Sequence, residues 1–217
     1  MRNPQASDII REIYGKAGCP CTEPAEGVYM SLHDADIREP LFEFLEEKYG
    51  KVRIIEEKQM GRSRADVVMV LPEAVAGIEI KSDADSYVRL GRQVKDYDRY
   101  FDYNWLVVGS THAMSSREHV PEWWGIISAE QIDPEKPVLD FYTIREAKRN
   151  PGADVKKKLK FLWREELSHI QKLNGMYKYS SKSKDFVIRK MAETVPEEIL
   201  HRQISEELFE RDYNIYS

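Results

Sequence analysis

The sequence has few cysteines and no long apolar run. Its 217 residues contain two cysteines, Cys19 and Cys21, so the chain carries no disulfide framework. The longest uninterrupted apolar run, Val67 to Leu71, is far shorter than the roughly 20 residues that a membrane-spanning helix needs. The N-terminal residues also lack the apolar region of a signal peptide. These absences predict a cytoplasmic protein with no membrane partner.

Charge is plentiful but unevenly distributed along the chain. The sequence is 33% charged and 41% hydrophobic, with a net charge of −5. Residues 145–190 nevertheless contain 14 basic and 5 acidic residues. A local positive zone can attract phosphates even in an acidic chain, which makes Lys156, Lys157 and Lys158 candidates for nucleic-acid binding. A solvated helix face is the alternative interpretation of the same lysines.

Hydrophobic periodicity predicts an α/β fold with the element order α-β-β-β-α-β. Three strands separated by short turns predict a meander, and a helix then crosses over to a fourth strand, which gives a mixed sheet with helices on both faces. We predict three regions, an N-terminal helix and loop extension (1–33), the α/β core (34–150) and a helical C-terminal region (151–217). The predicted elements are helices at 6–17, 34–50, 85–101 and 155–173 and strands at 51–58, 65–71, 75–81, 105–110, 123–128 and 138–144.

An acid and a base stand two residues apart in one of these strands. In Gly-Ile-Glu-Ile-Lys, Glu79 and Lys81 project from the same face of a strand whose other face is apolar. Asp66 lies at the start of the preceding strand, so a short turn brings its carboxylate beside that of Glu79. Two carboxylates and the backbone carbonyl of Ile80 form an all-oxygen site suited to Mg²⁺. Lys81 then lies within reach of a water or a phosphate oxygen, as phosphodiester hydrolysis requires.

At these residues the sequence resembles the PD-(D/E)xK nuclease superfamily, which has the restriction-endonuclease-like fold. The motif is "RADVV", with Asp66, followed by "IEIK", with Glu79 and Lys81. The superfamily core has the same α-β-β-β-α-β order as the one predicted here. The resemblance implies that Asp66 and Glu79 bind the metal and that Lys81 orients and activates water.

A second motif lies in the helix that follows. "QVKDY" places Gln93 and Tyr97 one helical turn apart on the same face. It resembles the Q-x-x-x-Y element of the RecB-like exonuclease branch, which implies that both residues lie near the active site and position the substrate or Lys81. A wider likeness, over roughly residues 34–170, is to a group of small bacterial and phage proteins.

The first core helix supplies a further acidic ligand in many members of that superfamily. Glu39 is the preferred candidate here, with Asp36 and Glu43 as alternatives on the same helix. Glu56 and Glu57, at the end of the first strand, are also possible ligands. Because this position is unresolved, the sequence does not decide between one metal ion and two.

Arginines on either side of the motif are candidates for phosphate contacts. Arg62 and Arg64 lie on the loop that leads to Asp66, and Arg89 and Arg92 lie on the Gln93 helix. Helix surfaces also carry arginine for solubility, which is the alternative for the second pair.

The sequence therefore predicts an enzyme, a Mg²⁺- or Mn²⁺-dependent phosphodiesterase acting on nucleic acid. The Q-x-x-x-Y resemblance favours DNA, but cleavage from an end or within a strand stays open. The alternative is a catalytically inactive nucleic-acid-binding or assembly module that keeps the fold. A homo-oligomer formed through residues 151–217 is compatible with either function.

Overall fold

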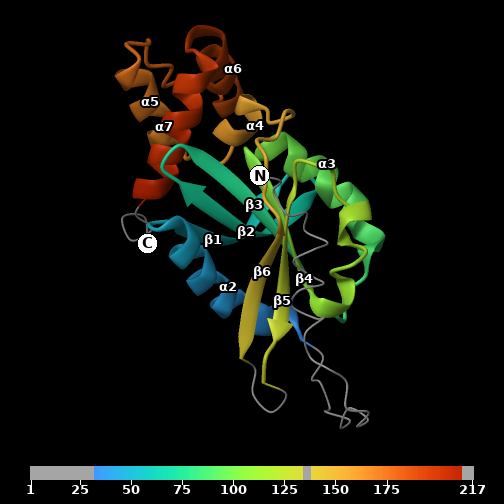
Figure 1. The fold of residues 1–217 in the computed structure, drawn as a ribbon. Helices are drawn as coiled ribbons and strands as arrows, with labels where there is room; N and C mark the ends of the chain where they lie inside the picture. Colours follow the sequence, from blue (N-terminus) through green and yellow to red (C-terminus); the bar gives the residue numbers. More distant parts are fainter. Residues whose placement is uncertain (1–31, 134–137, 212–217) are drawn as a thin grey trace, which may run out of the picture.

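A six-stranded sheet forms the centre of the molecule in the computed structural model, which describes residues 32–133 and 138–211 (Figure 1). The predicted helix at 6–17 and both cysteines lie outside the described residues. The strands follow one another across the sheet in chain order. They are β1 (Arg53–Met60), β2 (Ser63–Leu71), β3 (Ala74–Lys81), β4 (Tyr103–Gly109), β5 (Gly125–Gln131) and β6 (Leu139–Arg145).

The pairing directions confirm the predicted mixed sheet. Strands β1, β2 and β3 form the antiparallel meander. Helix α3 (Leu90–Tyr100) then connects β3 to a parallel β4, and β5 is parallel to β4. Strand β6 adds an antiparallel edge. With α2 (Asp34–Tyr49) in front, the order α-β-β-β-α-β is the one that the sequence predicts.

Alternating side chains of β2 supply the two hydrophobic layers. Val67 and Met69 face α2, whereas Val68 and Val70 face α3 and the C-terminal helices. Both faces of the strand are therefore buried, which explains its continuous apolar run. Gly77 of β3 lies so close to α3 that an added Cβ would come within 2.2 Å of the Phe101 ring. Glycine at this position lets the helix approach the sheet.

The C-terminal region is helical, as predicted, but its first helix is not continuous. The predicted helix at 155–173 is divided into α4 (Val155–Leu159) and α5 (Arg164–Leu173). Glu166 accepts a hydrogen bond from the backbone N–H of Trp163, which starts a new helix by capping it. Phe161 and Leu162, in the break, turn inward and are buried. Helices α6 (Lys184–Thr194) and α7 (Glu197–Glu210) complete the region.

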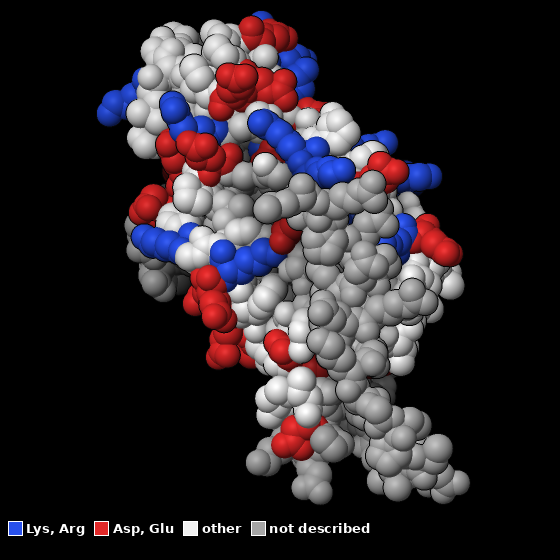
Figure 2. Space-filling model, in the orientation of Figure 1, with Lys and Arg blue, Asp and Glu red and all other residues white. Residues whose placement is uncertain are grey.

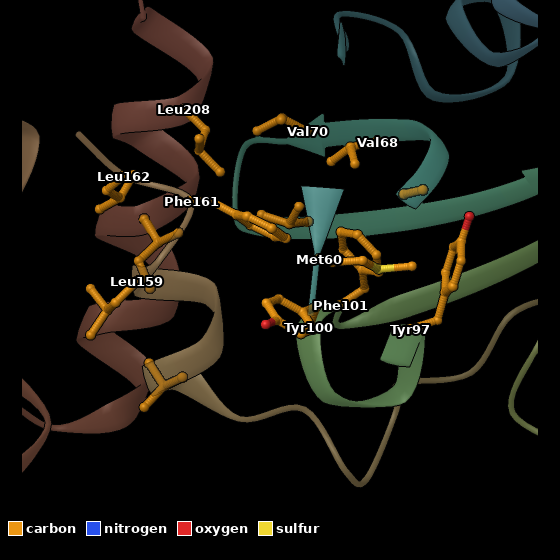
Figure 3. Packing of buried hydrophobic residues seen from close by; sticks show 14 of the residues in the cluster. Met60, Val68, Val70, Tyr97, Tyr100, Phe101, Leu159, Phe161, Leu162 and Leu208 are labelled. Carbon is orange, nitrogen blue, oxygen red and sulfur yellow. The ribbon is translucent and has the colours of Figure 1, made fainter. Parts of the chain in front are cut away.

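The C-terminal helices share one hydrophobic core with the sheet. Figure 3 shows Phe161 extending from the segment after α4 toward the strands. Its ring stacks on Phe101 with a centroid distance of 5.7 Å and also contacts Tyr100 at 5.3 Å. Leu208 of α7 joins the same cluster as Val70 of β2. Burial of each such side chain contributes roughly 1.5–3 kcal/mol, so α4–α7 and the sheet stabilise one another.

A buried ion network also joins α4 and α7 to the core. The Nζ atom of Lys158 lies 2.6 Å from Asp102 Oδ2, and His201 Nδ1 lies 3.2 Å from Asp102 Oδ1. Asp102 also accepts a hydrogen bond from the backbone N–H of Val75. Burial opposes ionisation of Asp102, but the contacts with His201, Lys158 and Val75 outweigh it and lower its pKa to about 2. Asp102 is thus a charged anchor for both helices.

This network corrects one sequence-based prediction. Lys158 was a candidate for nucleic-acid binding, but its side chain is 0% exposed and bonded to Asp102. It follows Val155 by three residues and precedes Leu159, so it lies on the apolar face of α4. Lys156 is exposed and Lys157 is half-buried, and both stay candidates. Figure 2 shows basic and acidic side chains intermixed over the lobe formed by α4–α7.

Among residues 32–133 and 138–211, no helix has the length and apolar character needed to cross a membrane.

Candidate active site

Strands β2 and β3 place the two predicted metal-binding carboxylates opposite each other. The pairing of Val67 with Ile78 puts Asp66 across from Glu79, one residue further along the hairpin. Directly opposite side chains in an antiparallel pair are about 5 Å apart at Cβ. Asp66 is fixed by a hydrogen bond of 2.9 Å that its Oδ2 accepts from the backbone N–H of Ile80.

Glu79 is completely buried, yet both of its oxygens have partners. Oε1 accepts hydrogen bonds from Lys81 Nζ and Gln93 Nε2, each at 2.5 Å. Oε2 lies 2.8 Å from the hydroxyl of Tyr97. These donors take the place of the water molecules that the carboxylate loses when it is buried. Glu79 and Lys81 in this core strand therefore bond to each other, and Gln93 and Tyr97 of α3 supply the other hydrogen bonds to Glu79. Ile78 and Ile80, on the other face of the strand, face α2.

Helix α3 presents Gln93 and Tyr97 to this pair. The Tyr97 hydroxyl lies 3.0 Å from the Ile78 carbonyl and accepts from the backbone N–H of Asp66 at 3.3 Å. Burial, followed by the charges of Glu79 and Asp66, raises the pKa of Tyr97 well above its ordinary value, so the group stays a neutral donor. Gln93 Oε1 is buried and has no hydrogen-bond partner within the described part of the chain. That oxygen is available to accept from a bound ligand.

The electrostatics around Asp66 favour a cation. Burial, and then the negative charge of Glu79, raise the pKa of Asp66 to about 7, although the Ile80 N–H and the Lys81 charge oppose the rise. Two carboxylates held together in a partly closed site each favour the presence of a positive charge. A divalent ion supplies that charge more strongly than a proton does.

These residues lie in a polar cavity of about 410 Å³. Its walls come from the N-terminal half of α2, the β1–β2 turn, the end of β3 and the start of α3. The lining residues are Asp34, Arg38, Glu57, Arg62, Ser63, Arg64, Asp66, Glu79, Ile80, Lys81, Asp85, Arg89, Arg92 and Gln93. Five carboxylates, one lysine and five arginines therefore converge on a space that is large enough for a phosphate group.

The predicted arginines all line the cavity, but the predicted acid of the first helix does not. Arg62, Arg64, Arg89 and Arg92 have exposed side chains, and of these four only Arg64 has an ion-pair partner among the described residues, Glu57 at 2.5 Å. Glu39 is exposed and lies outside the cavity. Helix α2 turns Ile37 and Leu41 toward the sheet, and this rotation brings Asp34, not Glu39, to the cavity.

Arg38 is a residue of this site that the sequence analysis missed. Its guanidinium lies 2.6 Å from Asp34, 3.0 Å from Glu56 and 2.8 Å from Glu57. It also donates a hydrogen bond of 3.2 Å to the carbonyl of Asp66. Glu56 and Glu57 thus pair with arginine. The i, i+4 spacing of Asp34 and Arg38 was the available sequence signal.

Glu57 has an unusual backbone conformation beside the cavity. Its φ of 56° is the only positive value at a non-glycine residue in the described ranges. The left-handed region costs such a residue roughly 1 kcal/mol or more. In return, the carboxylate reaches both Arg38 and Arg64. Strain of this kind often accompanies functional sites.

The donor set fits Mg²⁺ or Mn²⁺. Within the described residues, no three His, Cys, Asp or Glu side chains are grouped to hold a metal ion. Mg²⁺ is commonly held by one or two carboxylates, with water and substrate phosphates as its other ligands. Asp66 and Glu79 meet that requirement, and the Ile80 carbonyl remains a predicted third ligand.

Replacing Asp66 with asparagine is expected to stabilise the metal-free protein. The folded-state pKa of about 7 lies above the usual value of 3.8, so folding opposes ionisation of Asp66. Stability is therefore lost as the pH rises from about 4 to 7. Asparagine removes this loss, and we expect its Tm at pH 8, in EDTA, to exceed that of the wild type by about 5 °C. Thermal unfolding from pH 4 to 8 should show the gain shrinking toward pH 4. A gain independent of pH would contradict this account of Asp66.

Comparison with known families and structures identifies the chain at family level. It is a mixed α/β protein with a polar cavity at the ends of β2 and β3. The family model described as Bacteriophage P4 protein cII matches residues 29–215, and the chain belongs to that family. No curated protein matches the chain significantly. A solved structure, that of Pyrococcus furiosus SfsA in complex with Ca²⁺, is 15% identical with a TM-score of 0.32, covering 57% of this chain and 67% of that one. A TM-score this low supports no inference about this protein.

Proposed function

We propose that the protein is a divalent-metal-dependent nuclease that hydrolyses phosphodiester bonds in DNA. The observation that carries the proposal is the convergence of Asp66, Glu79 and Lys81 in one cavity with five arginines. Carboxylates hold the metal ion, lysine orients the attacking water, and arginines bind the phosphates that flank the scissile bond. The predicted catalytic residues Gln93 and Tyr97 act on the same group, because both contact Glu79.

Each side chain has a separate part in this reaction. A divalent ion held by Asp66 and Glu79 would offset the charge on the phosphate and make water a better nucleophile. Lys81 holds the attacking water in line and stabilises negative charge as the bond to the leaving oxygen breaks. Gln93 and Tyr97 keep the Glu79 carboxylate in position. Arg62, Arg89 and Arg92 bind the strand through its backbone, which carries no sequence information.

The substitution Glu57→Gly is expected to lower the activity while leaving the stability almost unchanged. Glu57→Gly relieves the positive-φ strain but removes the carboxylate shared by Arg38 and Arg64. We expect the Tm to stay within about 2 °C, because exposed ion pairs add little to stability. The value of kcat/KM should fall about tenfold, since Arg64 loses its only ion-pair partner in the described ranges and Arg38 loses one of its three. Glu56→Gln is the matched control, because Arg38 then keeps Asp34 and Glu57. Equal losses in both variants would refute this role for Glu57.

One observation favours a second candidate function, a nucleic-acid-binding module without catalysis. The Glu79 carboxylate already accepts hydrogen bonds from Lys81, Gln93 and Tyr97, so its negative charge is partly compensated without a metal ion. Calorimetric titration with Mn²⁺ distinguishes the two functions. A nuclease should bind the ion, and Asp66→Asn should abolish that binding. Absence of binding by the wild type would favour the module.

A further inference from the structure

Aromatic and basic side chains gather on the helical lobe, away from the residues that line the cavity. They belong to the segment 176–183, which connects α5 to α6, and to the first turns of α6. We call residues 176–190 the aromatic–basic segment. Its sequence, "MYKYSSKSKDFVIRK", alternates rings and cations in a way that none of the functions above explains.

Three rings form a row that runs from the core to the solvent. Phe186 and Tyr179 are half-buried and pack edge-on with their centroids 5.3 Å apart. Tyr177 lies 5.4 Å from Tyr179 and is 76% exposed. The outermost ring therefore presents most of its surface to water while its inner neighbours fix its position. Exposure of so large a side chain gains nothing for folding.

Side chains of α5 hydrogen-bond to the backbone beneath these rings. Arg164 Nη2 donates to the carbonyls of Tyr179 and Lys182, at 2.5 Å and 3.0 Å. Gln171 Nε2 donates to the carbonyl of Tyr177 at 2.9 Å. A surface whose shape is fixed before binding loses less entropy when a ligand docks. The row of rings is thus prepared for a partner.

Positive charge surrounds the row. The segment contains five basic residues, Lys178, Lys182, Lys184, Arg189 and Lys190, and one acid, Asp185. Lys182 Nζ and Arg189 Cζ lie 5.6 Å and 5.4 Å from the Phe186 ring. Lys178, Lys182 and Arg189 form no ion pair with any carboxylate in the described ranges. Asp185 is paired with Lys160. The partner of this surface should therefore be anionic and should offer flat faces for stacking.

We propose that the aromatic–basic segment is a second nucleic-acid contact, one that binds unpaired bases of a single strand. The proposal rests on the proposed function for its partner class. Exposed rings stack on bases of any sequence, and neighbouring lysines and arginines follow the phosphates. A duplex hides the faces of its bases, so the ring of Tyr177 would gain little from it. The substrate would then carry a single-stranded region that reaches the helical lobe.

The test measures binding separately from cleavage. A fluorescein-labelled oligodeoxythymidylate is titrated with protein carrying Lys81→Ala, in EDTA, and followed by anisotropy. Tyr177→Ala in this background should raise Kd about tenfold, because stacking on one ring is lost. Tyr177→Phe should keep the affinity, since the ring and not the hydroxyl makes the contact. Tyr142→Ala, at an exposed tyrosine of β6, is the matched control.

Two further comparisons sharpen the test. Replacing Lys178 and Lys182 with alanine should reduce the slope of log K against log salt by about 1.4 in magnitude. Tyr177→Ala and its parent should bind a blunt duplex with the same affinity. Unchanged single-strand affinity in Tyr177→Ala would overturn the inference, as would an equal loss with duplex. A change of oligomeric state in Tyr177→Ala would also overturn it, by showing that a second copy of the chain covers the segment.

Failure of this inference is distinguishable from failure of the proposed function. If the wild type cleaves and Tyr177→Ala binds normally, the proposed second contact is refuted and the proposed nuclease function stands. If Tyr177→Ala binds more weakly but the wild type cleaves nothing under any metal condition, the proposed contact stands and the proposed nuclease function is refuted.

Discussion

Lys81→Ala is expected to lower the cleavage rate by about 10²–10³-fold without unfolding the protein. The side chain of Lys81 is 11% exposed and lies against Glu79 inside the cavity, where it is the only lysine among the described lining residues. Loss of one preorganised donor to a developing charge has an effect of this size. Initial rates on labelled DNA in Mg²⁺ or Mn²⁺ provide the measurement.

The same variant separates catalysis from metal binding. Lysine is not a ligand, and it competes with a cation for Glu79, so Lys81→Ala should bind Mn²⁺ at least as tightly as the wild type. Lys148→Ala, at an exposed lysine outside the cavity, is the matched control for charge. Unchanged cleavage by Lys81→Ala would refute the assignment of this lysine.

Asp102→Ala is expected to cause the largest loss of stability among these substitutions. It leaves Lys158 buried without its partner and also removes the contacts with His201 and Val75. Breaking a buried ion pair on one side costs about 3–5 kcal/mol. In a protein of this size the loss corresponds to a Tm lower by about 10 °C. Thermal unfolding at neutral pH tests the prediction.

Two controls define the origin of that loss. The double variant Asp102→Ala/Lys158→Met should recover part of the stability, because no lysine charge is then left unpaired in the core. The pKa of Asp102, about 2, lies below its usual value of 3.8, so its contribution is present above pH 4 and lost as the pH falls toward 2. The gap between wild type and Asp102→Ala should therefore narrow as the pH falls from 4 toward 2. A gap that stays unchanged over that range would contradict this role for Asp102.

The sequence predicted the sheet and the centre of the site because local patterns determine both. The period-2 alternation of β3 separates Glu79 and Lys81 from the isoleucines on its other face. The turn at Pro72 and Glu73 fixes the pairing that places Asp66 opposite Glu79. The four-residue spacing in α3 then directs Gln93 and Tyr97 at the same carboxylate.

The predictions that were wrong depended on packing between distant segments. The rotation of α2 about its axis decides whether Glu39 or Asp34 reaches the cavity, and contacts with β2 set that rotation. The burial of Lys158 depends on Asp102, which lies 56 residues earlier in the chain. The break between α4 and α5 depends on the stacking of Phe161 on Phe101, 60 residues earlier in the chain. None of these contacts produces a periodic signal within a single element.

The most direct test of the account is the cleavage of a mixed panel of nucleic acids by the wild-type protein. The panel contains linear and circular DNA, single strands and RNA, each with Mg²⁺, with Mn²⁺ and with EDTA. We expect metal-dependent cutting of DNA that EDTA abolishes. Absence of cutting with either metal, in protein that also fails to bind Mn²⁺, would contradict it and leave a binding module that keeps the same fold.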